Sequence, residues 1–345
     1  MTVLAAQEAI DGLTASEPKR RFCVAPMMSH TDRHFRYFLR LLSRHSMLYT
    51  EMLTTGALLH GDTDRYVRYH AAEHPVGMQL GGSDPGELAS CAKIAADYGY
   101  DEINLNAGCP SKRVKSGHFG ACLMAEPGLV AECVATMAAA SGLPITVKTR
   151  IGIDDYDSYE HLGRFISTVA QAGCSTFIIH ARKAWLQGLS PRQNRSVPPL
   201  QYDLVYRLKQ DFPGLEIIIN GGITSLAEVR NHLLHVDGVM LGRAVCNNPY
   251  MLIGVDKNLF GVNNMPGTRK QILQNYMRYM EAEMANGEHL YAMSRHILGL
   301  FHGQHGARAY RRHLTANGHK SNAGVEIVDE ALALTGNKYQ NAGNK

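Results

Sequence analysis

The sequence predicts a (β/α)8 TIM barrel followed by a small all-helical C-terminal domain. Eight short apolar segments, several rich in β-branched residues, occur in the first 250 residues, and segments with helical spacing separate most of them. Continuous apolar strands are typical of parallel sheets that are buried on both faces, and strand–helix alternation produces right-handed βαβ units. Eight such units in about 250 residues match the usual size of this barrel. A doubly wound open sheet is the alternative.

The eight strands are expected where apolar runs end in polar or small residues. They are Phe22–Met27, Leu48–Met52, Pro75–Leu80, Glu102–Asn106, Pro144–Arg150, Thr176–Ala181, Glu216–Gly221 and Gly238–Gly242. Helices are expected between strands at Asp84–Tyr98, Glu126–Ser141 and Tyr159–Ala172. Before the first of these helices Ser83 can cap the N-terminus, and Pro85 fits the first turn, where no amide hydrogen bond is lost.

The pattern changes after Gly261. A cluster of Asn, Pro and Gly at residues 263–267 is typical of a linker, and no convincing strand follows. Helices are predicted there by apolar residues at helical spacing, namely Ile272, Tyr276, Tyr279 and Met280, then Met293, Ile297, Leu300 and Phe301. We therefore expect a flexible N-terminal arm at residues 1–20, the barrel at 21–262, a helical domain at 268–335 and a polar tail at 336–345.

Composition narrows the class of protein. Hydrophobic residues make up 45% of the 345 residues and charged residues 19%, which is ordinary for a globular protein. No apolar run approaches the roughly 20 residues needed to cross a bilayer, and Glu8 and Asp11 stand where a signal peptide would need a basic start. We therefore expect a cytoplasmic protein without a membrane segment. The seven cysteines show neither a C-x-x-C pair nor zinc-like spacing, so we expect free thiols and no metal site.

The excess of positive charge lies in the C-terminal part of the chain. Residues 1–264 contain 25 Lys+Arg and 25 Asp+Glu, whereas residues 265–345 contain 10 Lys+Arg and 6 Asp+Glu. Residues 289–325 include no acid but have six histidines. A basic surface of this kind suits a polyanionic partner. A solvated basic face without a partner is the alternative.

Polar residues and glycines follow most of the predicted strands, and in this type of barrel the C-terminal strand ends form the active site. The residues at these ends include Glu51, Gln79, Asn104, Asn106, Lys148, Arg150, His180, Asn220 and Arg243. Gly221-Gly222 and Gly242-Arg243 follow the last two strands, where such barrels commonly bind phosphate. Glycine amides can approach a phosphate closely, and Arg243 adds charge. The pattern indicates a planar, anionic, phosphorylated cofactor.

FMN fits this pattern. Lys148 could stabilise the negative charge of a reduced isoalloxazine ring, and Gln79 could bind the edge of the ring. Pro26, Met27 and Met28 could pack against its face. Two alternatives remain open: a salt bridge between Lys148 and an acid in the barrel mouth, and plain core packing for the two methionines.

Cys109 is the candidate for acid chemistry. It lies between Gly108 and Pro110, on the loop after the fourth predicted strand. An ordinary thiol is mostly protonated at neutral pH, so Cys109 could donate a proton as well as attack. Lys112 and Arg113 would instead favour the thiolate. A small buried structural cysteine is the alternative.

Taken together, these motifs resemble the tRNA-dihydrouridine synthase family. The segment from Asn104 to Ser111 resembles the family's signature. The other motifs follow in the family's order, namely Ala25-Pro26-Met27, Gln79, Thr146–Arg150, His180-Ala181-Arg182, Asn220-Gly221-Gly222 and Gly242-Arg243. The resemblance covers roughly residues 20–320. The stretches at 183–191 and 299–308 resemble the subfamily that acts on D-loop uridines 20 and 20a.

This resemblance implies an FMN enzyme that reduces uridine in tRNA, with NADPH as the electron donor. It implies hydride transfer from reduced FMN to C6 of uracil and protonation of C5 by Cys109. It assigns FMN binding to Pro26, Met27, Met28, Gln79, Lys148, His180, Asn220, Gly221, Gly222, Gly242 and Arg243, and tRNA contact to Asn106, Arg192, Arg195, Arg308 and Arg311. It also implies that the helical domain binds tRNA, and we expect a monomer.

The residues themselves are consistent with an RNA substrate. A base must leave its stack to reach a barrel mouth. Residues 182–195 form an acid-free basic run beyond the sixth strand, and Arg308, Arg311 and Arg312 share one face of a predicted helix. Trp185 either packs or stacks against a base. The alternatives are a flavin barrel that acts on a free pyrimidine and an RNA-binding protein built on an inactive barrel.

Overall fold

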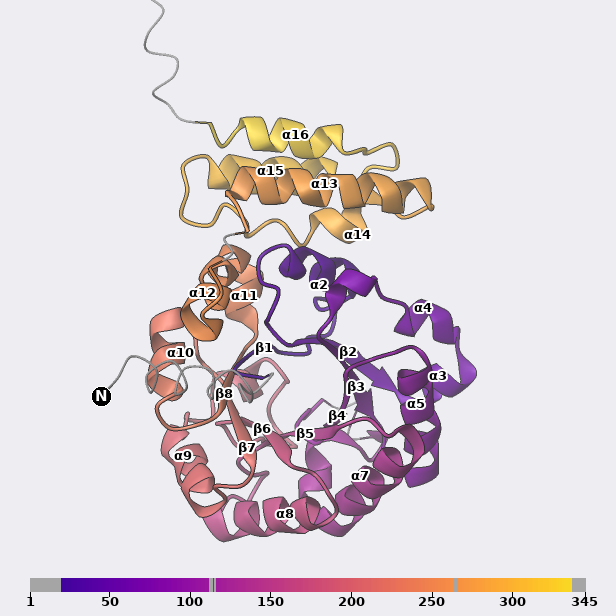
Figure 1. Cartoon of the computed structure of the whole chain (residues 1–345), viewed down its shortest axis with the longest axis vertical. Helices are drawn as coiled ribbons and strands as arrows, with labels where there is room; N and C mark the ends of the chain where they lie inside the picture. The colour runs from indigo at the N-terminus through magenta and orange to yellow at the C-terminus, as the bar shows by residue number, and fades with distance from the viewer. Residues whose placement is uncertain (1–19, 112–113, 115, 264–265, 337–345) are drawn as a thin grey trace, which may run out of the picture.

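The computed structural model describes residues 20–111, 114, 116–263 and 266–336. Its strands are β1 (Phe22–Val24), β2 (Leu48–Thr54), β3 (Val76–Gly81), β4 (Glu102–Asn106), β5 (Ile145–Arg150), β6 (Thr176–His180), β7 (Glu216–Asn220) and β8 (Gly238–Leu241). All paired strands are parallel, in the order β1-β8-β7-β6-β5-β4-β3-β2. Figure 1 shows these strands at the centre of a ring of helices.

Backbone hydrogen bonds close the sheet between its two edges. The amide of Val24 donates to the carbonyl of Met47, and the amide of Met47 donates to the carbonyl of Phe22, both at 2.9 Å. Met47 directly precedes β2, so β1 and β2 meet and the sheet forms a barrel. The predicted (β/α)8 fold is therefore confirmed, and the open sheet is excluded.

The helices around the barrel are α2 (Arg33–Arg40), α3 (Thr55–His60), α4 (Thr63–Val67), α5 (Pro85–Asp97), α7 (Pro127–Ser141), α8 (Tyr159–Gln171), α9 (Tyr202–Asp211), α10 (Leu226–His232), α11 (Arg243–Asn247) and α12 (Val255–Phe260). The expectation that Ser83 caps α5 is wrong. Asp84 is the cap, because its Oδ1 accepts a hydrogen bond from the amide of Glu87 at 2.8 Å. Pro85 occupies the first turn as expected.

All eight predicted strands are present, but several end earlier than expected. The first strand stops at Val24 instead of Met27, and Pro26, which lacks an N–H group, cannot donate a ladder hydrogen bond. The strands β7 and β8 likewise stop before Gly221 and Gly242. The flavin-binding candidates among these residues therefore lie on loops at the barrel mouth.

Ion pairs close the opposite end of the barrel. Arg20 pairs with Glu102 at 2.5 Å and with Glu216 at 2.9 Å, which are the first residues of β4 and β7. Above them the barrel interior is filled by a buried cluster that includes Tyr49 and Met240. Arg20, the last residue of the expected N-terminal arm, thus contacts the barrel. The rest of that arm, and residues 337–345 of the expected tail, lie outside the described residues.

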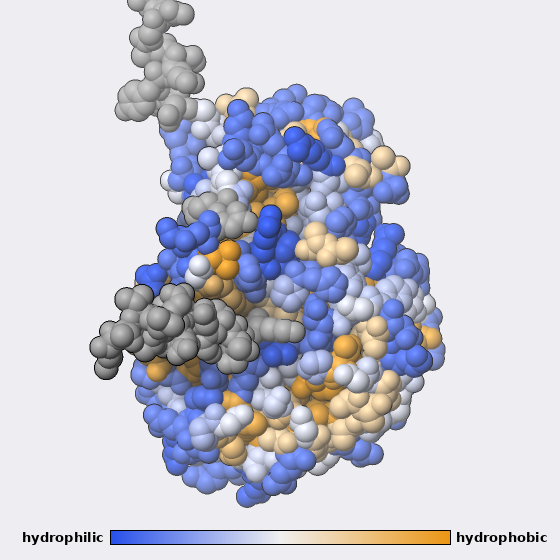
Figure 2. Space-filling model, viewed as in Figure 1, coloured by the Kyte–Doolittle hydropathy of each residue, from blue (hydrophilic) through white to orange (hydrophobic). Residues whose placement is uncertain are grey.

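A helical region follows the barrel. It contains α13 (Arg269–Ala285), α14 (Leu290–Ser294), α15 (Ala307–Asn317) and α16 (Glu326–Ala333), and Figure 1 places it beside α2. In the view of Figure 2 its surface is mainly hydrophilic. None of the helices in the described part of the chain has the length and apolar character needed to cross a membrane.

The helical spacing predicted from Met293 to Phe301 is only partly correct. Helix α14 ends at Ser294, and turns lead from there to α15. Ile297 and Leu300 are nevertheless fully buried. Apolar residues three and four positions apart can therefore face a core from successive turns without a continuous helix.

Aromatic rings and ion pairs join α2 to the helical region. The rings of Tyr37 and Tyr279 stack with their centroids 3.9 Å apart, and the Tyr276 hydroxyl donates to the carbonyl of His34 at 3.0 Å. Asp32, which caps α2, pairs with both Arg295 and His296. The helical region is therefore held against the loop that enters α2.

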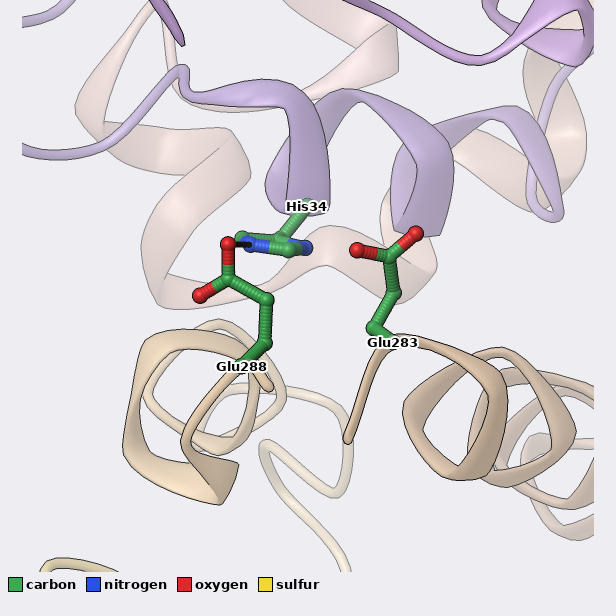
Figure 3. Close-up of side chains that lie close together, drawn as sticks. All are labelled: His34, Glu283 and Glu288. Atoms are coloured by element: carbon green, nitrogen blue, oxygen red, sulfur yellow. Dashed lines mark ion pairs between the residues drawn. The ribbon is translucent and has the colours of Figure 1, made fainter. Parts of the chain in front are cut away.

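One side-chain cluster at this junction has the composition of a metal site. Figure 3 shows His34 facing Glu283 and Glu288, and their ligand atoms lie within 4.8 Å of one another. However, Arg33 pairs with Glu283 at 2.5 Å and with Glu288 at 2.8 Å, and the hydroxyl of Tyr279 lies 2.8 Å from Nδ1 of His34. Because Arg33 balances the carboxylates, we interpret the cluster as an ion-pair junction.

Candidate active site

A chain of buried amides lines the barrel mouth across β3, β4 and β5. Asn106 Nδ2 donates to Gln79 Oε1 at 3.0 Å, and Gln79 Nε2 donates to Asn104 Oδ1 at 2.7 Å. Asn104 Nδ2 in turn donates to Thr146 Oγ1 at 2.8 Å. These bonds fix the orientation of each amide, and each NH2 group retains one further hydrogen. The mouth therefore offers a rigid edge of hydrogen-bond donors.

Asn106 also holds the loop that carries Cys109. Its Oδ1 accepts from the amides of Gly108 at 3.1 Å and Cys109 at 2.9 Å, which is an Asx turn. Cys109 is partly exposed and forms no disulfide. The resemblance implied that Asn106 contacts tRNA, which stays a prediction, and the structure shows that Asn106 positions the Cys109 loop. Lys112 and Arg113, expected to favour the thiolate, lie outside the described residues.

Lys148 lies among polar groups in the mouth without a carboxylate. Its Nζ donates to Asn220 Oδ1 at 3.2 Å, and Asn220 Nδ2 donates to the carbonyl of Met240 at 2.7 Å. Among the described residues no acid lies within ion-pair distance of Lys148, so the salt-bridge alternative fails. Burial and, to a smaller extent, nearby Arg150 lower the pKa of Lys148 to about 7, and Cys109 opposes both effects. An anion bound beside Lys148 would favour its ammonium form.

Arg150 links two loops of the mouth, a role that the sequence did not reveal. Its Nε donates to the carbonyl of Gly108 at 2.8 Å, and one terminal nitrogen donates to the carbonyl of Asn194 at 3.1 Å. Burial lowers the pKa of Arg150 to about 10, and Cys109 opposes that shift. Arg150 therefore ties the Cys109 loop to the loop that carries Arg195.

The turn after β7 requires glycine. Gly221 has φ 117° and Gly222 has φ 74°, a region that favours glycine. A Cβ on Gly221 would lie 2.5 Å from Cδ2 of His180, and one on Gly222 would lie 2.6 Å from Cδ1 of Leu200. The hydroxyl of Tyr202 donates to the carbonyl of Gly221 at 2.7 Å. Gly222 is exposed and Gly221 is buried, so bare backbone reaches the surface at Gly222, where the sequence predicted a phosphate site.

His180 and Arg243 border this turn. Burial holds the pKa of His180 well below its usual range, and Arg150 and Lys148 lower it further. His180 is therefore neutral and can both donate and accept a hydrogen bond. Arg243 is exposed, and one of its terminal nitrogens lies 3.4 Å from the carbonyl of Arg195. The candidate cofactor residues at the C-terminal ends of β5 to β8 therefore lie at the same end of the barrel.

The two methionines of the β1–α2 loop differ in their surroundings. Met27 packs against the interior cluster of the barrel, and its backbone is held by hydrogen bonds with Thr31. Met28 is 60% exposed. The core-packing alternative therefore applies to Met27, whereas Met28 is available to contact a bound molecule.

The basic residues predicted to contact RNA are exposed. Arg192 directly precedes the short 3-10 helix η3 (Gln193–Arg195), Arg195 is the last residue of that helix, and Arg308 and Arg311 lie on α15. Within the described part of the chain, none of the four pairs with a carboxylate. The pKa of Arg195 is lowered by burial and by Arg243, and Cys109 opposes that shift. Arg195 therefore lies near the thiol, at the inner edge of this basic surface.

Trp185 is held beside the same surface. Asn194 receives a hydrogen bond from the amide of Trp185 at 2.8 Å and donates one to its carbonyl at 2.9 Å. The ammonium of Lys183 lies 4.2 Å from the centroid of the indole ring. The ring is partly buried, so packing against its own loop accounts for part of its surface.

Comparison with known proteins agrees with this architecture. Residues 23–335 match the family described as dihydrouridine synthase (Dus). The tRNA-dihydrouridine(20/20a) synthase of Vibrio cholerae is 57% identical over 91% of this chain and 96% of its own length. The proteins of the same name from Shewanella oneidensis and Escherichia coli are 58% and 55% identical over 90% and 93% of this chain, and over 92% and 97% of their own lengths. The chain therefore belongs to the dihydrouridine synthase family.

Proposed function

We propose that the protein is a flavin-dependent tRNA-dihydrouridine synthase that reduces the C5–C6 double bond of uridine 20 or 20a in the tRNA D-loop. The main support is that one barrel mouth combines three features. They are the partly exposed Cys109, a Lys148 without a carboxylate partner in the described residues, and the turn at Gly221 and Gly222, which suits a phosphate. The names of the relatives in Vibrio cholerae and Escherichia coli supply the position of the uridine. We expect a monomer that acts in the cytoplasm.

The mouth suits FMN because its parts match the parts of that cofactor. Neither Gly221 nor Gly222 can carry a Cβ without a clash, so only glycine backbone lines this turn, where its amides can approach a phosphate, and Arg243 adds a charge for it. Lys148, Gln79 and the exposed Met28 would contact the ring. When bound and reduced, FMN would supply the hydride for C6 of uracil, and NADPH is the proposed electron donor.

The protein's own residues would complete the reduction. Cys109 would donate the proton that C5 requires, because it is partly exposed and its loop is held in place by Asn106. Asn106 retains one amide hydrogen for the uracil edge. The base would enter flipped out of its stack, which costs least in a strained single-stranded loop.

The exposed arginines favour tRNA over a free pyrimidine. Arg195 near the thiol and Arg308 with Arg311 on α15 have no carboxylate partner in the described residues, and a nucleobase alone offers no phosphate for them. A polyanion would satisfy both groups. A barrel that only binds RNA would not need Lys148 and Cys109 in one mouth.

The direct test uses tRNA that lacks dihydrouridine. Purified protein with FMN and NADPH should convert uridine 20 or 20a, detected by mass mapping, and should leave free uridine unreduced. Reduction of free uridine at a comparable rate would instead support the small-molecule enzyme. A colourless protein that cannot take up FMN would contradict the flavin proposal.

We expect the Lys148→Met variant to have a more negative flavin reduction potential. Loss of one charge-assisted contact of about 1.5–3 kcal/mol corresponds to roughly 30–65 mV for a two-electron couple. Because the pKa of Lys148 is about 7, an anionic reduced ring would draw a proton onto Lys148 above that pH. The wild-type potential should then fall about 30 mV per pH unit more steeply than that of the variant.

Spectroelectrochemistry between pH 6 and 9 measures both quantities. The Lys148→Arg variant is the matched control, because it keeps the positive charge but does not titrate in this range. The Lys148→Arg variant should retain most of the wild-type reduction potential but should not show the additional decrease of that potential with pH. Equal potentials in wild type and Lys148→Met would show that the ammonium does not act on the flavin.

We expect Arg195→Ala and Arg308→Ala each to weaken tRNA binding while flavin reduction by NADPH stays unchanged. Each lost phosphate contact should reduce the slope of log K against log salt by about 0.7–0.9. The double variant should be roughly additive if the two patches contact separate parts of the tRNA. Arg230→Ala is the control, because Arg230 is exposed in the last turn of α10, at the barrel end remote from the mouth. An unchanged salt slope in both single variants would mean that these arginines are only solvated.

A further inference from the structure

Arg182 follows β6 at the barrel mouth and has an unused hydrogen-bond donor. One of its terminal nitrogens donates to the carbonyl of Pro198. Its Nε is buried and has no hydrogen-bond partner among the residues that the structure describes. A buried N–H group of a charged side chain is costly to leave unpaired, so the described residues do not fully satisfy the guanidinium group of Arg182.

The charges around Arg182 also lack an anion. Burial lowers its pKa, nearby Arg243 lowers it further, and Tyr202 opposes the shift. Neither Arg182 nor Arg243 has a carboxylate within ion-pair distance in the described ranges of the chain. Two guanidinium groups that influence each other in this way repel, and an anion between them would turn that repulsion into attraction.

Tyr202 connects this pair of arginines to the glycine turn. Its hydroxyl donates to the carbonyl of Gly221 at 2.7 Å and would lie 3.0 Å from a Cβ on Gly222. Arg182 is close enough to the same tyrosine to affect its pKa, and Arg243 directly follows Gly242. Arg182 and Arg243 therefore border the bare backbone of the glycine turn.

Arg195 has different surroundings. Burial lowers the pKa of both arginines, an effect that Cys109 opposes for Arg195 and Tyr202 opposes for Arg182, and Arg182 donates to the carbonyl of Pro198. Arg195 thus extends toward the reacting thiol, whereas Arg182 lies with Tyr202 on the side of the glycine turn. We therefore expect Arg195 to contact the part of a bound molecule near Cys109, and Arg182 to contact the part near the glycine turn.

We propose that Arg182 is a second cationic ligand of the cofactor's terminal phosphate and, together with Arg243, selects a dianionic phosphate monoester. This proposal rests on the proposed function, because it assumes that the glycine turn binds FMN. A monoester dianion can accept hydrogen bonds from both guanidinium groups and balance both charges. Riboflavin has no phosphate, and the bridging phosphates of FAD are diesters with one charge each, so neither can balance the pair at this position.

The test compares ligands that differ only in the phosphate. The apoprotein is titrated with FMN and with riboflavin, and binding is followed by flavin fluorescence. In the Arg182→Gln variant FMN should bind about 10- to 100-fold more weakly, as expected for one charge-assisted contact, while riboflavin binds as in wild type. Added salt should weaken FMN binding less in the variant than in wild type, because one charge is missing.

Two further variants sharpen this test. Arg182→Lys should recover part of the FMN affinity, because it restores the charge without the planar fork. Arg230→Gln, which removes an exposed arginine from the last turn of α10, should bind both flavins as wild type does. Unchanged riboflavin binding also shows that the Arg182→Gln variant is folded.

Three outcomes would overturn the proposal. Equal losses of FMN and riboflavin affinity would show that Arg182 only supports the loop, and an unchanged FMN affinity would show that it does not contact the phosphate. In both cases wild-type binding of FMN leaves the proposed function intact. If the wild-type apoprotein bound neither flavin, the proposed function would fail, and the role of Arg182 with it.

Discussion

The Cys109→Ala variant should reduce uridine in tRNA roughly 100-fold more slowly than wild type, or slower still, which is the usual effect of losing a general acid. The thiol lies on a loop fixed by Asn106 and Arg150, so it has a defined position relative to the mouth. The donation of a proton to uracil does not involve NADPH. Flavin reduction by NADPH should therefore proceed at the wild-type rate, and only the transfer to tRNA should be slow.

Rapid mixing under anaerobic conditions separates these two half-reactions. Flavin absorbance follows reduction by NADPH in one experiment and reoxidation by tRNA in the other. Cys122→Ala is the matched control, because Cys122 is also partly buried but lies on the later 3-10 helix η2 (Gly120–Ala125). If both half-reactions slowed together in Cys109→Ala, the cysteine would be structural. If neither slowed, another group would have to supply the proton.

The fold could be predicted because each barrel strand carries its own signal. An apolar run such as Ile217-Ile218-Ile219 that ends in a polar residue identifies a buried parallel strand without any knowledge of its neighbours. The candidate site follows from the fold, since the C-terminal ends of all eight strands meet at one mouth. Gln79, Lys148 and Asn220 are therefore placed together by topology, although they are far apart in the sequence.

The contacts within the site could not be predicted in the same way. Arg150 was visible as a polar strand end, but its bonds to Gly108 and Asn194 depend on how two loops fold over it. Ser83 and Asp84 are both residue types that favour the N-cap position. Which of them caps α5 depends on the residue at which the backbone becomes helical, and the sequence does not reveal this. The pairing of Asp32 with Arg295 joins residues separated by 263 positions, beyond the reach of local patterns.

The pairing of Asp32 with Arg295 connects the β1–α2 loop to the helical region. Asp32 ends the loop that carries Met28, and its Oδ1 caps α2 by accepting from the amide of Phe35 at 2.9 Å. The same carboxylate pairs with Arg295 and with His296, the latter at 2.9 Å. One side chain thus connects the end of the proposed flavin loop to the turn that follows α14 in the proposed RNA-binding region.

The Asp32→Ala variant should lower the free energy of unfolding by about 2.5–4 kcal/mol, the sum of a lost helix cap and a lost set of charge-assisted bonds. Asp32→Asn should lose less, because asparagine can still cap the helix. Urea denaturation followed by tryptophan fluorescence and by circular dichroism measures these differences. Lys93→Ala is the control, since its pair with Asp97 is exposed and should contribute little.

The pH dependence of the free energy of unfolding separates the contribution of the Asp32 charge from that of the helix cap. His296 and Arg295 hold the pKa of the Asp32 carboxyl well below its usual range, against the effect of burial. A carboxyl with a lowered pKa stabilises the folded state above its unfolded value of about 3.9 and loses that effect as pH falls toward the folded value. The difference between wild type and Asp32→Asn should therefore shrink below about pH 4. A difference that did not change with pH would mean that the ion pairs do not stabilise the junction, and that only the cap does.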